Sequence, residues 1–209
     1  MNEDSLDLDS VQVTSTAEVH SEGSLTALVL GVMLLMAVLM TASAWWSIRQ
    51  GKQHPGRSPL RLLSDLPPPV GLLAALTVLL LFVVQAVAVL DVYQQTTSVH
   101  PDTWEYFQYV SWVRLLGMSH VHLFGYTVMY GLLGFLLTLT RASERLKSVL
   151  ISGMLWAGLF DVVSWWGLKA LTAKFDWLTM STGAISGTCS LIAGLFVIRE
   201  VFSKGAWKS

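Results

Sequence analysis

Five apolar runs limit the fold of this chain more than any other feature. Each reaches the length of about 20 residues that a helix needs to cross a hydrocarbon core about 30 Å thick. The expected spans are 25–47, 70–90, 113–140, 149–168 and 178–198. Only 13% of the residues are charged, against about 25% in a soluble domain. Because backbone groups in lipid must be satisfied within the segment, we expect an all-α integral membrane bundle of five transmembrane helices.

The rest of the chain divides around this bundle. Residues 1–23 carry six acidic residues and no Lys or Arg, which is unlike a cleavable signal peptide and predicts a polar, disordered tail. The transmembrane domain covers 24–203, and 204–209 form a short second tail. Between the second and third spans, residues 92–112 are polar and aromatic. They predict an interfacial loop with a short amphipathic helix.

The distribution of Lys and Arg predicts the orientation. If the N-terminus is outside, 10 of the 13 cations face the cytoplasm, as the positive-inside rule requires. These ten are Arg49, Lys52, Arg57, Arg61, Arg141, Arg145, Lys147, Arg199, Lys204 and Lys208. We therefore expect an outside N-terminus, a cytoplasmic C-terminus and direct contact with the lipid bilayer.

Two classes of function are not indicated. The formal net charge is −1 and there is no basic face of the kind that binds phosphate backbones, so nucleic acid is not an expected partner. Cys189 is the only cysteine. A disulfide within the chain, a Cys-x-x-Cys zinc site and a covalently attached haem are therefore not expected.

Asp161 is the costliest residue to place in lipid, at about 2.5 to 3.5 kcal/mol on insertion scales. A helix rises about 1.5 Å per residue. Measured from the expected cytoplasmic end of each span, Asp161, Gln85 and Tyr126 therefore all lie at a height of about 20 to 22 Å. Asp161 should therefore face the bundle and have a partner. It either locks its helix to Gln85 or Tyr126, or acts as a proton relay or a group that orients an imidazole.

His120 and His122 are the only pair of basic-nitrogen ligands within a span. Two residues apart on a helix, their side chains point about 200° apart around the axis, so they face different neighbours and do not share one metal ion. They are either interfacial imidazoles bonded to backbone, water or lipid, or ligands of a cofactor or metal. Gly125 and Gly131 on the same helix would let a flat macrocycle approach.

Two further patterns carry weaker predictions. His100 could join Asp91 and one of the two span histidines in a mixed copper or zinc site, because imidazole suits both ions. Gly183 and Gly187 have the Gly-x-x-x-Gly spacing that permits close helix packing, in this chain or against another.

A short segment resembles a known family. The residues that carry the resemblance are His120, His122, Tyr126, Met129 and Gly131. They are similar to the His-x-His helix of the large catalytic subunits of haem–copper oxidases and nitric oxide reductases. In that family the two histidines ligate two different haems from opposite faces of one helix. The family's second intramembrane histidine for a bis-His haem and its copper-site histidines are missing here.

A longer stretch, from His120 to about Ile192, resembles small bacterial inner-membrane proteins. Those proteins carry a His-x-His helix followed by Asp-x-x-Ser-Trp-Trp, which in this chain is 161–166. The resemblance implies a common site that joins His120, His122 and Asp161 in a multi-pass protein of the bacterial inner membrane. It implies no activity.

Three functions are compatible with these residues. The leading hypothesis is a membrane subunit of a respiratory or electron-transfer complex that binds b-type haem or a quinol near the periplasmic face. His120 or His122 would be the ligand, Met118, Met129 or a partner's residue a sixth ligand, and Asp161 a proton acceptor. The alternatives are a non-redox structural or assembly subunit of a membrane complex, and a small transporter or proton channel that uses Asp161 and Gln85.

Overall fold

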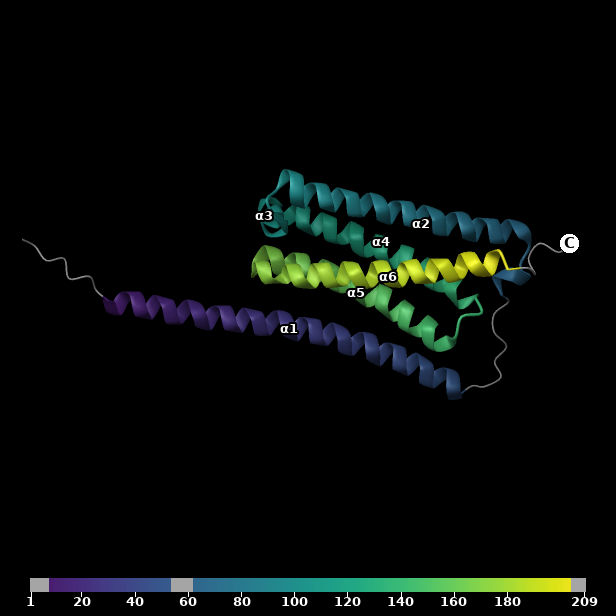
Figure 1. Cartoon of the computed structure of the whole chain (residues 1–209), viewed down its shortest axis with the longest axis horizontal. Coiled ribbons are helices and arrows are strands. Elements are labelled where there is room, and N and C mark those ends of the chain that lie inside the picture. Colours follow the sequence, from purple (N-terminus) through teal and green to yellow (C-terminus); the bar gives the residue numbers. More distant parts are fainter. Residues whose placement is uncertain (1–7, 54–61, 204–209) are drawn as a thin grey trace, which may run out of the picture.

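The computed structural model describes residues 8–53 and 62–203 and, within them, the side chains of 24–50 and 62–203. Every element in these ranges is helical (Figure 1). The long helices are α1 (Leu8–Gln53), α2 (Pro68–Gln94), α4 (Trp112–Thr138), α5 (Glu144–Ala170) and α6 (Asp176–Val201). The shorter elements are η1 (Leu63–Asp65), the π-helical turn η2 (Gln95–Val99), α3 (Thr103–Tyr109) and η3 (Ala173–Phe175).

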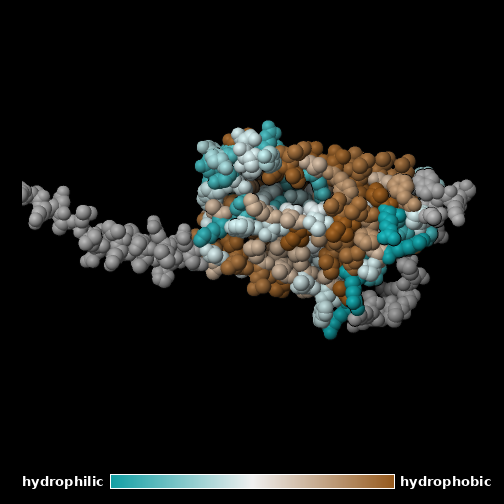
Figure 2. Space-filling view, viewed as in Figure 1, coloured by the Kyte–Doolittle hydropathy of each residue, from teal (hydrophilic) through white to brown (hydrophobic). Residues whose placement is uncertain are grey.

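Five helical segments are long and apolar enough to cross a membrane, which confirms the predicted all-α fold of five spans. They are Ser24–Gln50, Pro68–Val99, Trp112–Thr138, Glu144–Ala170 and Ala173–Val201. Hydrophilic residues gather at the two ends of the bundle and hydrophobic residues lie between them (Figure 2). This distribution is what a bilayer requires of the lipid-facing surface.

Polar residues at the helix ends set several of the boundaries. The Ser111 hydroxyl accepts a hydrogen bond of 3.2 Å from the Arg114 backbone N–H at the start of α4. Ser143 does the same for the Leu146 N–H at 3.3 Å, so α5 begins at Glu144. The hydropathy pattern alone placed that start at 149, because it does not register the stabilisation that an N-cap serine gives to a polar first turn.

Two helices extend beyond the expected spans. α1 begins at Leu8, inside the segment that we expected to be a disordered tail, because extending an existing helix adds one hydrogen bond for each residue fixed. α2 continues past Asp91 to Gln94 and into η2. Asp91 is exposed there, so its carboxylate does not have to end the helix. The expected short helix in 92–112 is α3.

α5 is the central helix of the bundle. It packs against α1, α3, α4 and α6, whereas α2 packs mainly against α6. Small residues on α5 allow these close contacts, and Gly153, Ala157 and Gly158 are all buried. The residues of α2 from Ala86 to Gln94 are exposed, and Figure 2 shows a hollow between α2 and α6 toward the end that carries α3.

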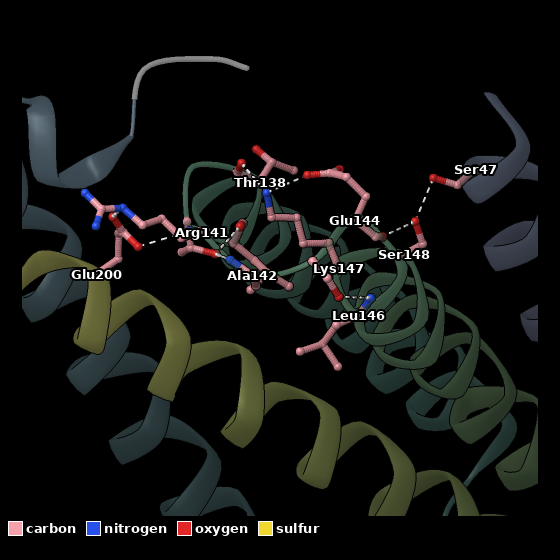
Figure 3. A network of polar contacts seen from close by, with 12 residues as sticks. Ser47, Thr138, Arg141, Ala142, Glu144, Leu146, Lys147, Ser148 and Glu200 are labelled. Carbon is pink, nitrogen blue, oxygen red and sulfur yellow. Dashed lines mark hydrogen bonds and ion pairs between the residues drawn. The ribbon is translucent and has the colours of Figure 1, made fainter. Parts of the chain in front are cut away.

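The bundle has a basic end, where α4 and α6 finish and α5 begins. Glu200 of α6 is buried at this end. Its Oε2 accepts a hydrogen bond of 3.0 Å from the Arg141 backbone N–H, and its Oε1 lies 3.4 Å from the Arg141 Nε (Figure 3). The other end carries α3, together with Arg114, Lys169 and Lys174. The cations of the described residues are therefore divided between the two ends in the way that the five spans predict.

The turn between α5 and α6 depends on Gly167. A Cβ atom there would overlap the ring of Phe175, which is buried. We expect Gly167→Ala to lower the free energy of unfolding by about 1 to 3 kcal/mol through overpacking. Gly131→Ala is the matched control because a Cβ at Gly131 meets nothing within 4 Å. Unfolding in detergent, followed by circular dichroism, should separate the two variants, and equal midpoints would contradict this packing.

Candidate functional site

Asp161 of α5 is held by side chains from the two neighbouring helices. Tyr126 of α4 donates its hydroxyl to Oδ2 at 2.8 Å. Thr182 of α6 donates to Oδ1 at 3.1 Å. Each carboxylate oxygen thus has a donor, which is the condition for placing this group within a membrane span. The prediction that Asp161 faces the bundle and has a partner is therefore confirmed, and of the two partners expected, Gln85 or Tyr126, it is Tyr126 that bonds to it.

His122 lies one helical turn from Tyr126 on the same face of α4. Its Nδ1 is 2.8 Å from the Met118 carbonyl oxygen. A carbonyl can only accept, so Nδ1 carries the hydrogen and Nε2 keeps its lone pair for a ligand or a proton. The ring stands edge-on to Trp165 at a centroid distance of 4.7 Å and edge-on to Tyr126, the partner of Asp161, at 5.9 Å.

Gly158 makes room for the tyrosines of this site. The rings of Tyr126 and Tyr130 stack at 5.4 Å with an angle of 10°. A Cβ on Gly158 would come within 3.1 Å of both rings, which is tighter than ordinary van der Waals contact. The glycine therefore sets how closely α4 approaches α5, and so where the Tyr126 hydroxyl lies.

Gln85 does not bond to Asp161. Its side chain exchanges hydrogen bonds with Ser190 of α6, at 3.0 Å and 3.1 Å. The polar residues thus form two groups, Asp161 with Tyr126 and Gln85 with Ser190.

Sequence reasoning missed the polar face of α6. Thr182 bonds to Asp161, and Thr179 lies 2.7 Å from the Ser164 hydroxyl of α5. The signal was the helical spacing of four hydroxyl residues: Thr179, Thr182, Ser186 and Ser190. The prediction for α6 was based on the spacing of Gly183 and Gly187 instead. A Cβ at Gly183 or Gly187 would meet nothing within 4 Å, so these two glycines do not pack closely against the described part of this chain.

The other predicted residues lie apart from this group. His120 is exposed and His122 half-buried, in keeping with the different faces predicted for them. Met129 packs against the core cluster that contains Leu133. It lies seven residues, or about 10 Å of helix, from His122, so both cannot ligate one iron.

His100 is packed against aromatic rings near α3. Its ring lies 5.4 Å from that of Tyr106 and 5.1 Å from that of Tyr109. Across the described residues, no group of three or more His, Cys, Asp or Glu side chains lies together as a metal site. The expected copper or zinc site of His100, Asp91 and a span histidine is therefore not assembled there.

A match to one protein family supports the membrane assignment. Residues 102–207 match the family Aq_1264_TM, described as a transmembrane helical domain. The chain belongs to this family. The match covers just over half of the chain, from the N-cap of α3 to the end of α6, and so includes His122, Tyr126, Asp161 and Thr182 but not Gln85. No curated protein and no solved structure matches the chain.

The two hydrogen bonds to Asp161 can be measured separately. We expect Tyr126→Phe and Thr182→Val each to lower the free energy of unfolding, with a coupling energy of about 0.6 kcal/mol between Asp161→Asn and Tyr126→Phe in a double-mutant cycle. Tyr93→Phe, at an exposed position on α2, is the control. Unfolding of the wild type, the two single variants and the double variant in mixed micelles gives the four free energies of this cycle. Strict additivity of Tyr126→Phe and Asp161→Asn would contradict the bond.

Proposed function

We propose that this membrane protein is a subunit of a respiratory or electron-transfer complex and binds a quinol at His122, Tyr126 and Asp161. The observation that supports the proposal best is the Nδ1 contact of His122 with the Met118 carbonyl at 2.8 Å. It fixes the ring and leaves Nε2 available to accept a hydrogen bond from a quinol hydroxyl. Asp161, paired with Tyr126, provides a second proton acceptor beside it.

The chemistry of a quinol matches the character of these groups. Oxidation of a quinol to a quinone releases two electrons and two protons. The electrons pass to a redox centre of a partner subunit, such as a haem or an iron–sulfur cluster. One proton would pass to His122 Nε2 and the other to the Asp161 carboxylate, which bonds to Tyr126, a ring neighbour of His122. The apolar tail of the quinol would lie in lipid, and the hollow between α2 and α6 offers an entry (Figure 2).

A b-type haem is the second candidate, and the same contact favours it. Axial histidine ligands donate Nδ1–H to a carbonyl or carboxylate, which orients Nε2 toward the metal. Met118 and Met129 both lie on the helix of His122 and cannot reach the opposite side of one iron. The sixth ligand would therefore come from a partner subunit.

We propose the outside N-terminus as the orientation of the bundle. The end with Arg141, Arg145 and Lys147 would then face the cytoplasm, in agreement with the positive-inside rule. His122, in the half of α4 nearer α3, would lie toward the periplasmic face of a bacterial inner membrane. Protons released from a quinol there would leave on the periplasmic side.

The first test is the binding of decylubiquinol, the reduced form that carries the donor hydroxyls, to the purified protein under anaerobic conditions, followed by quenching of tryptophan fluorescence. Trp165 lies against His122 and should report binding. His122→Phe keeps a ring on Trp165 but removes both nitrogens, and we expect about tenfold weaker binding, the effect of losing one buried hydrogen bond. His120→Phe makes the same change on the exposed face and should leave binding unchanged.

The alternatives predict different results in the same preparation. A Soret band that disappears in His122→Phe would favour haem over quinol. A structural subunit would bind neither, and the double variant of His120 and His122 would leave electron flow unchanged. A proton channel would lose flux in vesicles with Asp161→Asn but keep it with His122→Phe. Equal quinol binding by the wild type and His122→Phe would overturn the quinol site.

The orientation is tested by labelling single cysteines in intact cells with a reagent that does not cross membranes. In a Cys189→Ala background, Asp102→Cys near α3 should react and Ser143→Cys at the basic end should not. Both positions are exposed, so burial does not bias the comparison. The reverse pattern would place the N-terminus in the cytoplasm and the quinol site near the cytoplasmic face.

A further inference from the structure

A cavity of about 310 Å³ lies between α1 and α5 at the basic end of the bundle, on the opposite side of α5 from Asp161. Its lining combines hydroxyl, charged and apolar side chains. They are Ser43, Trp46, Ser47, Thr138, Glu144, Lys147, Ser148, Ile151, Ser152, Leu155 and Trp156. None of these residues takes part in the proposed quinol site, so an inference from the cavity does not rest on that proposal.

The charged part of the cavity is an ion pair between a buried and an exposed side chain. Lys147 is only 6% exposed; its Nζ donates to the Thr138 carbonyl at 3.1 Å and to Glu144 Oε1 at 2.8 Å (Figure 3). An ammonium group has three donors, so one N–H remains. The Glu144 side chain is 77% exposed and can accept more hydrogen bonds than the one from Lys147.

Serine hydroxyls join α1 to α5 along this cavity. Ser47 and Ser148 are 2.9 Å apart, and Ser43 and Ser152 are also 2.9 Å apart. The Trp156 indole N–H closes the inner side by donating to Ser43 at 3.1 Å. These contacts make a polar wall between two membrane spans, and they hold α1 against α5 at a spacing that leaves the cavity beside Lys147.

The other wall is apolar and faces outward. Trp46 is 64% exposed and Leu155 41% exposed, at positions where the bundle would contact lipid chains. A ligand of this cavity should therefore have an apolar tail as well as a polar head. A free phosphate or a free amino alcohol would satisfy only the polar half of the lining.

The charges of the lining select the polar head. The charges of Lys147 and Glu144 cancel. Arg49 of α1 does not add a positive charge to the lining, because its guanidinium carbon lies 3.9 Å from the centroid of the Trp45 ring. An anionic head would contact Lys147 but be repelled by Glu144. A quaternary ammonium has no N–H to donate to a carboxylate. A primary ammonium beside a phosphate matches both side chains, since Lys147 donates to the phosphate and Glu144 accepts from the ammonium.

We propose that the cavity binds one phospholipid whose head group carries a primary ammonium next to its phosphate, as in phosphatidylethanolamine. The phosphate lies at Lys147 and the ammonium at Glu144. The acyl chains pass along Leu155 and Trp46 into the bilayer.

Native mass spectrometry of the full chain in detergent tests this directly. Equal amounts of dioleoyl phosphatidylethanolamine, phosphatidylcholine and phosphatidylglycerol are added, and retained lipid is counted for each species. We expect one retained phosphatidylethanolamine, at about ten times the level of either competitor, which corresponds to one charge-assisted hydrogen bond. Added phosphoethanolamine without acyl chains should not displace it; displacement would assign the site to a free phosphate compound.

Two variants locate the site and a third is the control. Lys147→Met should reduce retention about tenfold, whereas Arg145→Met removes an exposed charge of the same helix that does not line the cavity and should not. Glu144→Gln leaves Lys147 uncompensated, so the preference should move from phosphatidylethanolamine to phosphatidylglycerol. Because Glu144 is exposed, this variant folds even if Lys147→Met does not. Unchanged preference in Glu144→Gln, or equal retention of all three lipids by the wild type, would overturn the proposal.

Discussion

The arrangement of α4, α5 and α6 depends on the need to satisfy one carboxylate inside a membrane span. Asp161 has a donor from each of the two neighbouring helices, Tyr126 on one side and Thr182 on the other. Each of these contacts requires the helices to face one another at a fixed height. Lipid chains cannot supply a replacement donor, so a rotation of either helix would leave an unsatisfied oxygen at a cost of several kcal/mol. Glycine at 158 lets α4 come close enough for the Tyr126 hydroxyl to reach.

α5 serves two polar sites because its two faces are used separately. Ser152 and Asp161 are nine residues apart, which places them about 180° apart around the helix axis. One face meets α1 through Ser148, Ser152 and Trp156, and the other meets α4 and α6. The two sites share no side chain. A substitution in one can therefore leave the other intact, which makes their functions separable by mutation.

Much of this structure follows from the sequence, and the remainder depends on pairings between helices. Hydropathy identifies the five spans, and the cost of burying Asp161 predicts a partner such as Tyr126. Helical periodicity predicts different faces for His120 and His122. It does not predict that Thr182 rather than Gln85 completes the Asp161 pair, because that depends on the rotation of α6. The burial of Lys147 was not predicted either. A lysine that follows a turn is normally solvated, and nothing in the local sequence distinguishes a buried lysine there from a solvated one.

The family match covers one of the two sites completely and the other only in part. It spans α3 to α6 and therefore contains the whole Asp161 pair and His122, while α1 lies outside it. The proposed quinol site could form on the matched residues alone, because its hydrogen bonds run only within and between α4, α5 and α6. The cavity could not, since Ser43, Trp46 and Ser47 supply its α1 wall. Lys147 and Glu144 would then face lipid without the hydroxyl wall that encloses them here, so any selection of a head group depends on the addition of α1.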